Sequence, residues 1–279
     1  MENKKVFILL NDYTSPNPVT DFGVHLAKAL NKPAVMLAIE KIPQAYPAAA
    51  IAGAGIAQPP ILNMEEVKQK VKPYLRDKAI NLGRVWRQVD YDVAIGFTTS
   101  KVISLTEERD PYLLVIEGRS DLTTINEWFG TYETTIAEGA DCPVLVVPSD
   151  YVWQPVKKVL HIMEAEDAKV ENMRVLTDMT RNLKADLQVV LISEEETAAG
   201  TEKYHEMLTV FQDLLAYKNV TFHRVIGEKK AEQVAKWVDT LSADWLSFEQ
   251  KSLRFYERIF NNYNTKRIIL QSDVPVLVF

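Results

Sequence analysis

The chain has one cysteine among its 279 residues, only ten glycines and no apolar run long enough to cross a membrane. A single thiol excludes an intrachain disulfide and fits a reducing compartment. A basic excess is also lacking: residues 1–152 carry 15 basic and 19 acidic side chains, and residues 153–279 carry 17 and 19. Neither half therefore offers the positive surface that nucleic acid or an anionic membrane requires. Because no secretory signal follows Met1, we expect a cytoplasmic protein that binds neither nucleic acid nor membrane.

What the sequence does contain is one pattern written twice. The stretch 117–147 returns as 249–279 with a constant shift of 132 and no gap. Glu-Gly-Arg-Ser at 117–120 becomes Glu-Gln-Lys-Ser at 249–252, and Asp-Cys-Pro-Val-Leu-Val becomes Asp-Val-Pro-Val-Leu-Val. Matched landmarks in the same order indicate an internal repeat.

Short apolar runs alternate with amphipathic stretches in both halves, five runs in each. The run Val6–Leu10 is apolar throughout, as expected for a parallel strand covered on both faces. A helix over 18–31 follows it. This alternation predicts the α/β class, with two tandem Rossmann-like domains at 1–152 and 153–279, each a five-stranded parallel sheet with helices on both faces.

The main difference between the halves is an insert at 43–63, which has no charged residue and is rich in Ala, Pro and Gly. It is either a loose surface loop or an apolar flap over a ligand or partner, since an uncharged patch of that length tends to be covered. Its Gly53-Ala-Gly55 lacks the third glycine and the strand–turn–helix context of a dinucleotide loop, so we expect no nicotinamide site.

Two loops of the first half lie where open parallel sheets bind ligands, beyond the carboxyl ends of the strands. One contains Asn11 and Asp12, and Asp12 can accept hydrogen bonds from ribose hydroxyls. The other contains Gly118, which permits close approach of the backbone, followed by the donors Arg119 and Ser120. A predicted helix follows, and its free N–H groups can receive a phosphate.

These features resemble the universal stress protein family, and the whole chain resembles a tandem pair of such domains. The resemblance rests on the strand, glycine loop and helix followed by Cys-Pro-Val-Leu-Val-Val at 142–147. It implies a motif Gly-x-x-Gly, nine residues, Gly-Ser/Thr that holds the phosphates of ATP, and an acidic residue after the first strand that holds the ribose. Gly118, Gly130 and Thr131 match the motif, and Asn11 and Asp12 straddle the ribose position.

The chain also departs from that pattern. Asp121 stands where the second glycine belongs, and only eight residues separate it from Gly130. A carboxylate facing a triphosphate weakens binding unless a metal or arginine offsets it. In the second half every motif position is replaced, by Gln250, Leu253, Asn262 and Tyr263. The resemblance therefore implies ATP in the first domain only.

We predict a non-enzymatic regulatory or stress-response protein whose two domains pair with each other through their fifth strands, as the resemblance implies. Two alternatives stay open: a switch that binds or slowly hydrolyses ATP, and a ligand-free scaffold whose insert 43–63 mediates self-association or binds an unknown protein partner. We expect no catalytic residue and no metal. Cys142 has no neighbouring base, and His161 and Glu164 fall on opposite faces of a strand.

Overall fold

The computed structural model describes residues 4–12, 14, 17–40, 64–118, 131–164, 169–192, 201–202, 204–205, 208–209, 211, 217–226, 233, 236–237, 240–249 and 274–279. Strands and helices alternate along most of the chain. In order they are β1 Val6–Leu10, α1 Pro18–Ala29, β2 Ala34–Glu40, α2 Met64–Leu82, β3 Val89–Ile95, α3 Thr98–Arg109, β4 Leu113–Gly118, α5 Thr131–Gly139, β5 Val144–Pro148, β6 Lys158–Glu164, α6 Val170–Leu183, β7 Asp186–Ile192, β8 Val220–Val225, β9 Trp245–Phe248 and β10 Val276–Val278.

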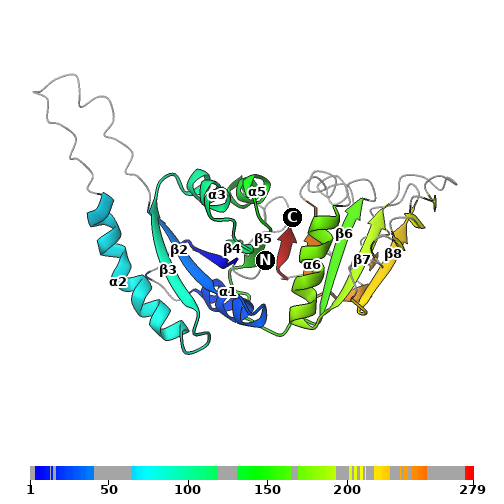
Figure 1. Ribbon diagram of the computed structural model, residues 1–279, viewed down its shortest axis with the longest axis horizontal. Coiled ribbons are helices and arrows are strands. Elements are labelled where there is room, and N and C mark those ends of the chain that lie inside the picture. Colours follow the sequence, from blue (N-terminus) through cyan, green and yellow to red (C-terminus); the bar gives the residue numbers. More distant parts are fainter. Residues whose placement is uncertain are drawn as a thin grey trace, which may run out of the picture.

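The ten strands within the described residues form one sheet, in the order β3-β2-β1-β4-β5-β10-β9-β6-β7-β8. Neighbouring strands are parallel except at the centre, where β10 pairs with β5 antiparallel, Val144 opposite Val278 and Val146 opposite Val276. The C-terminal strand thus lies in the middle of the molecule beside a strand of the first half (Figure 1). The strand order on one side of this pair repeats in reverse on the other.

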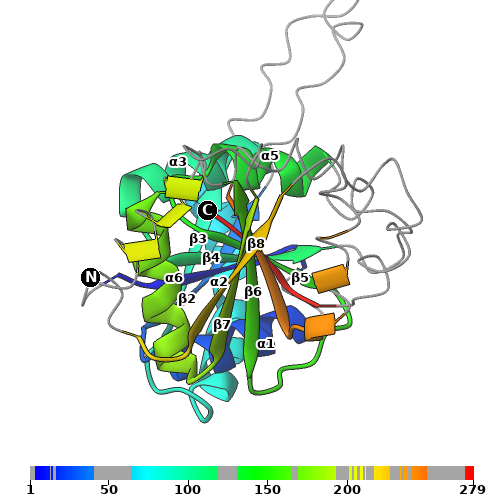
Figure 2. The ribbon, with the colours of Figure 1, turned by 90° about the vertical axis from the view of Figure 1, so that its right-hand side faces the viewer.

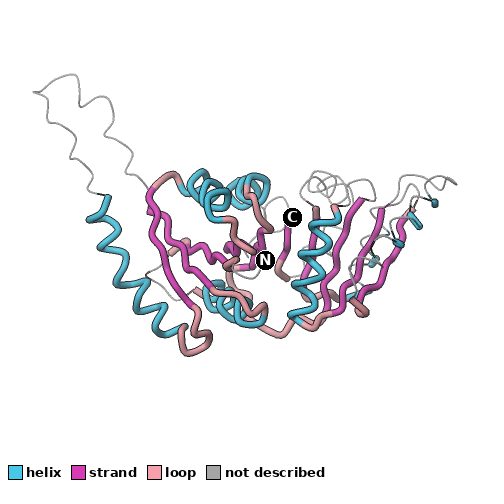
Figure 3. Tube along the Cα trace, viewed as in Figure 1, coloured by secondary structure: helices cyan, strands magenta, loops and turns pink. Residues whose placement is uncertain are grey.

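Helices cover both faces of the sheet. On one face α1, α2 and α6 bury Phe22, Val71 and Met173 against the strands. On the opposite face α3 and α5 bury Val102 and Ile136. In the first half, α1 and α2 lie on one side of the strands, and α3 and α5 lie on the other side (Figure 3). A perpendicular view shows the strands fanning out, as expected from the twist that accumulates across a wide sheet (Figure 2).

The start of α1 shows how local sequence sets the elements. Asn17 has an extended backbone, and its side-chain Oδ1 accepts a hydrogen bond from the backbone N–H of Thr20 at 3.1 Å. Pro18 follows at the first helical position, where its fixed φ suits the helix and its missing N–H costs nothing. The helix therefore begins at residue 18, as predicted, and ends at Ala29.

An aromatic cluster lies in the core on the α1 face of the sheet. The ring of Phe22, from α1, lies 5.3 Å from Trp153, 5.7 Å from Tyr151 and 6.3 Å from Trp245 of β9, measured between centroids. We call these four side chains the seam cluster. Since Phe22 belongs to the first half and Trp245 to the second, the cluster packs the two halves against each other.

A hydrogen bond also joins the two halves. The hydroxyl of Tyr112, just before β4, donates to Oδ2 of Asp178 on α6 at 3.1 Å. Burial and the neighbouring Asp178 carboxylate raise the pKa of Tyr112 above its ordinary value, so the phenol stays protonated. The ammonium of Lys32 lies 4.8 Å from the centroid of the same ring.

The predicted α/β class is confirmed. The two predicted five-stranded groups are joined into a single ten-stranded sheet at the β5–β10 pair. The insert 43–63 and the beginning of the helix expected near 125 lie outside the described residues. Among the helices that are described, none is long and apolar enough to span a membrane.

Candidate functional site

The carboxyl ends of β1 and β4 meet at one carboxylate, that of Glu117. Its Oε2 accepts hydrogen bonds from Nδ2 of Asn11 at 3.0 Å and from Nδ2 of Asn17 at 3.2 Å. Asn11 directly follows β1 and Asn17 caps α1, so Glu117 holds both ends of the connection between that strand and that helix. This arrangement fixes the connection beside Gly118, the last residue of β4.

Asp12 lies in the same connection and is oriented by its own turn. Its Oδ1 accepts hydrogen bonds from the backbone N–H of Thr14 at 2.8 Å and from the Thr14 hydroxyl at 2.6 Å. Across from it, burial lowers the pKa of Lys78 on α2, while the carboxylates of Asp21 and Asp12 act in the opposite direction. The Asp12 side chain is therefore held in place at an exposed position, with a cation nearby.

Three of the seven predicted site residues lie at this edge of the sheet: Asn11, Asp12 and Gly118. The hydrogen bond from Asn11 to the residue before Gly118 brings the two loops together. Thr131 begins α5, and its side chain is outside the described part. Arg119, Ser120 and Gly130 also lie outside the described residues, as do Asp121 and its surroundings.

The second half uses the equivalent strand ends differently. Glu249, directly after β9, is only 2% exposed, and its Oε2 accepts a hydrogen bond from Nδ2 of Asn172 on α6 at 2.7 Å. Its Oε1 lies 4.0 Å from Nε2 of His161 on β6. On the other side of the ring, His161 Nδ1 shares a hydrogen bond of 2.9 Å with the hydroxyl of Ser247 on β9. We call these four side chains the buried polar cluster.

Burial sets the protonation state of this cluster. His161 is fully buried, and loss of hydration lowers its pKa from 6.5 to about 3. The imidazole is neutral near pH 7, and its hydrogen bond to Ser247 holds it across the two paired strands. The ring of His161 and the carboxylate of Glu249 are thus both buried inside the described part of the second half.

Two residues of the first-half site were missed by the sequence reasoning, namely Asn17 and Glu117. The signal available for Asn17 was its place directly before Pro18, which is typical of a helix start. Glu117 belongs to the internal repeat, in which Glu249 is its counterpart, and that shared acid was the available signal. Each carboxylate accepts a hydrogen bond from an asparagine, Glu117 from Asn17 at the start of α1 and Glu249 from Asn172 on α6. Lys78 gave no signal, since its approach to Asp12 depends on how α2 packs.

The other chemical candidates are inert or absent from the described part. Burial is the main cause that raises the pKa of the Cys142 thiol to about 12, so the thiol is not a nucleophile near neutral pH. Within the described residues no three His, Cys, Asp or Glu side chains gather closely enough to hold a metal ion.

Comparison with known proteins relates this fold to solved structures and not to any sequence family. No family model and no curated protein matches the sequence. A universal stress protein from Archaeoglobus fulgidus DSM 4304 aligns over 98% of this chain and 95% of its own, with a TM-score of 0.63 and 14% identity. A functionally unknown protein from Pseudomonas aeruginosa PAO1 gives 0.57 and 15%, over 99% and 92% of the two chains. The cytoplasmic domain of a prokaryotic cation chloride cotransporter gives 0.55 and 10%, over 99% and 95%. Over its whole length, the chain has the fold of the universal stress proteins.

Proposed function

We propose that this chain is a non-enzymatic, cytoplasmic regulatory protein of the universal stress type, which binds an adenine nucleotide such as ATP in its first half only. In this proposal residues 1–152 and 153–279 are tandem units that pair through β5 and β10. The fold alone does not decide the function, because the cytoplasmic domain of a cotransporter shares it.

The observation that carries the proposal is the contrast between Glu117 and Glu249. In the first half, Asn11 and Asp12 are exposed around Glu117 and lie beside Gly118. In the second half, the matching carboxylate is buried with His161 and Asn172. The carboxyl ends of the first-half strands therefore present polar side chains to solvent, whereas the matching polar side chains of the second half are buried in the core.

The first-half residues fit a nucleotide in part. The exposed Asp12 carboxylate can accept hydrogen bonds from ribose hydroxyls, and Gly118 allows a close approach of the backbone. The carboxylates of Asp12 and Glu117 disfavour a bare triphosphate, so we expect binding to require Mg²⁺, whose charge offsets the repulsion.

Thermal unfolding with and without ATP–Mg²⁺ tests the proposal. A site in the native state raises stability by RT ln(1 + [L]/Kd), or about 2.7 kcal/mol at a hundredfold excess of ligand over Kd. We expect a clear upward shift in Tm for the wild type, and loss of that shift in Asp12→Ala and in Gly118→Asp. Mass spectrometry of the protein as isolated adds a check for copurified nucleotide.

A matched control is Glu164→Ala, which removes a carboxylate from the end of β6, the second-half position equivalent to the end of β1. This variant should keep the full ATP-induced shift. A wild type that shows no shift would contradict nucleotide binding and favour the scaffold, in which deletion of 43–63 abolishes self-association or partner recovery. Steady release of phosphate that Asp12→Ala abolishes would instead favour the ATP-hydrolysing switch.

A further inference from the structure

The strand β3 is one end of the ten-stranded sheet, and among the described strands it pairs with β2 alone. Its register against β2 is continuous, from Ala34 opposite Val89 to Glu40 opposite Ile95. An edge strand carries a row of backbone N–H and C=O groups that face away from the sheet, and such a row is a template for pairing with a further strand. Whether β3 can join another chain depends on what occupies those outward groups.

The hydrogen bonds at the two ends of β3 show which of its residues face outward. The backbone N–H of Ala34 donates to the carbonyl of Gln88 at 2.8 Å, and the N–H of Gly96 donates to the carbonyl of Glu40 at 3.0 Å. In a parallel pair, alternate residues direct both of their backbone groups to the same neighbour. Even-numbered residues from 88 to 96 therefore bond to β2, and odd-numbered residues direct their N–H groups to the edge.

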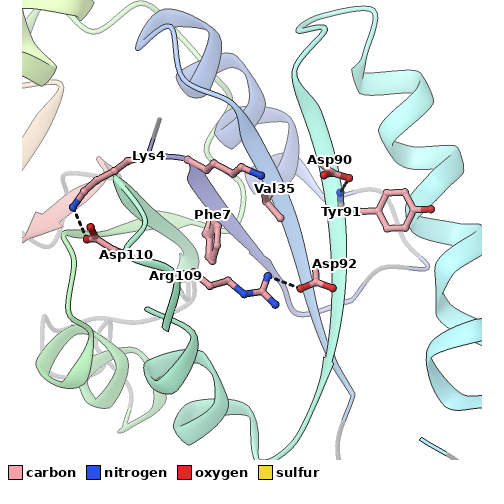
Figure 4. A pocket seen from close by; sticks show the side chains of 9 residues that line it. Lys4, Phe7, Val35, Asp90, Tyr91, Asp92, Arg109 and Asp110 are labelled. Atoms are coloured by element: carbon pink, nitrogen blue, oxygen red, sulfur yellow. Dashed lines mark hydrogen bonds and ion pairs between the residues drawn. The ribbon is translucent and has the colours of Figure 1, made fainter. Parts of the chain in front are cut away.

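The two N–H groups at the centre of this edge are already used, each by the aspartate before it. Asp90 Oδ1 accepts a hydrogen bond from the backbone N–H of Tyr91 at 2.8 Å (Figure 4), and Asp92 Oδ1 accepts one from the N–H of Val93, also at 2.8 Å. Because each backbone N–H is a single donor, an incoming strand has to displace the carboxylate before it can pair.

The Asp92 carboxylate is also held from its other side. Arg109, the last residue of α3, places Nη1 2.5 Å from Oδ2 of Asp92 (Figure 4), while Oδ1 keeps its hydrogen bond to Val93. The two side chains are 41% and 34% exposed, and an ion pair so close to water adds little stability. Its effect is to fix the direction of the Asp92 carboxylate, with Oδ1 on the N–H at the strand edge.

We propose that Asp90 and Asp92 are edge caps, which keep β3 from pairing with the β3 strand of a second copy of this chain. Two such edges are self-complementary when they run antiparallel about a twofold axis. With Tyr91 of each copy opposite Val93 of the other, both residue pairs exchange hydrogen bonds, and every donor in that exchange is an N–H that an aspartate now occupies. The caps withhold the groups that this pairing needs. This proposal does not depend on whether the first half binds a nucleotide.

Size-exclusion chromatography with light scattering tests the caps on the full chain. Asp90→Ala/Asp92→Ala removes both acceptors, and at about 100 μM protein we expect its mass to be at least double that of the wild type. Asp90→Asn/Asp92→Asn removes the same two charges but keeps side-chain oxygens that can accept from the next N–H, so it should match the wild type. Hydrogen–deuterium exchange in peptides that cover 89–95 should be slower in the associated alanine variant than in the wild type.

Glu107→Ala/Glu171→Ala is the matched control, because it removes two exposed carboxylates from α3 and α6 and leaves the β3 edge intact. It should keep the wild-type mass, and circular dichroism should show that each variant is folded. Asp90→Ala alone keeps the ion pair between Asp92 and Arg109, so it tests the edge even if the double variant fails to fold, and it should associate more than the wild type.

The proposal is overturned if both alanine variants of the edge keep the wild-type mass. It is also overturned if the asparagine variant or the Glu107→Ala/Glu171→Ala control associates as strongly as Asp90→Ala/Asp92→Ala, because loss of charge would then account for the association without the hydrogen bonds.

Discussion

Truncating Phe22 to alanine is expected to lower the free energy of unfolding by about 3–5 kcal/mol, the usual cost of deleting a fully buried phenylalanine ring. The ring is completely buried and meets three aromatic side chains of the seam cluster, so no neighbour can easily fill the space that it leaves. A typical domain is stable by only about 5–15 kcal/mol, so much of the margin would be lost. Urea unfolding followed by tryptophan fluorescence measures the change.

Phe97→Ala is the matched control, because it makes the same chemical change at a ring that is 66% exposed. We expect that variant to stay within about 0.5 kcal/mol of the wild type. Since Phe22 contacts Trp245 of the second half, the cluster should also couple the halves, and Phe22→Ala should weaken both. A loss below about 1 kcal/mol would contradict the account of the seam cluster.

Lowering the pH below about 6.5 is expected to destabilise the protein through His161. Its pKa is about 3 in the folded chain and about 6.5 when unfolded, so between those values the unfolded state binds a proton that the native state does not. The contribution of His161 is therefore fully present above pH 6.5. It is lost at up to about 1.4 kcal/mol per pH unit as the pH falls. Urea unfolding at several values between pH 4.5 and 7.5 measures this slope.

The double variant His161→Ile/Ser247→Val isolates the effect. It copies the first half, where Ile8 and Val115 are paired across β1 and β4. This variant should lose the part of the slope that His161 contributes, whereas Ser247→Val alone keeps the imidazole and should keep the slope. If Glu249, 4.0 Å away, held His161 protonated in the folded state, the free energy of unfolding would not decrease as the pH is lowered. The contribution of His161 would instead be lost as the pH is raised.

The buried strands were predictable because burial on both faces of a parallel sheet demands continuous apolar runs. The run at Val6–Leu10 became β1 without a change of boundary, and all five residues are buried. The start of α1 was predictable for a similar local reason, since Asn-Pro is a strong helix-start signal.

The polar contacts at the strand ends were not predictable, because they depend on register between distant segments. His161 and Ser247 are 86 residues apart and meet only because β6 and β9 are neighbours in register. Glu117 meets Asn11 over a separation of 106 residues for the same kind of reason. Residue types and spacing predicted which loops lie at the carboxyl ends of the strands. Packing determined which of the polar side chains there stay exposed to solvent.

The proposal that only the first half binds nucleotide is tested most directly by hydrogen–deuterium exchange with and without saturating ATP–Mg²⁺. We predict slower exchange in peptides that cover 5–20 and 113–118, and no change in peptides that cover 158–164 and 245–249. Protection of the second-half peptides, or no protection in either half, would contradict the proposal.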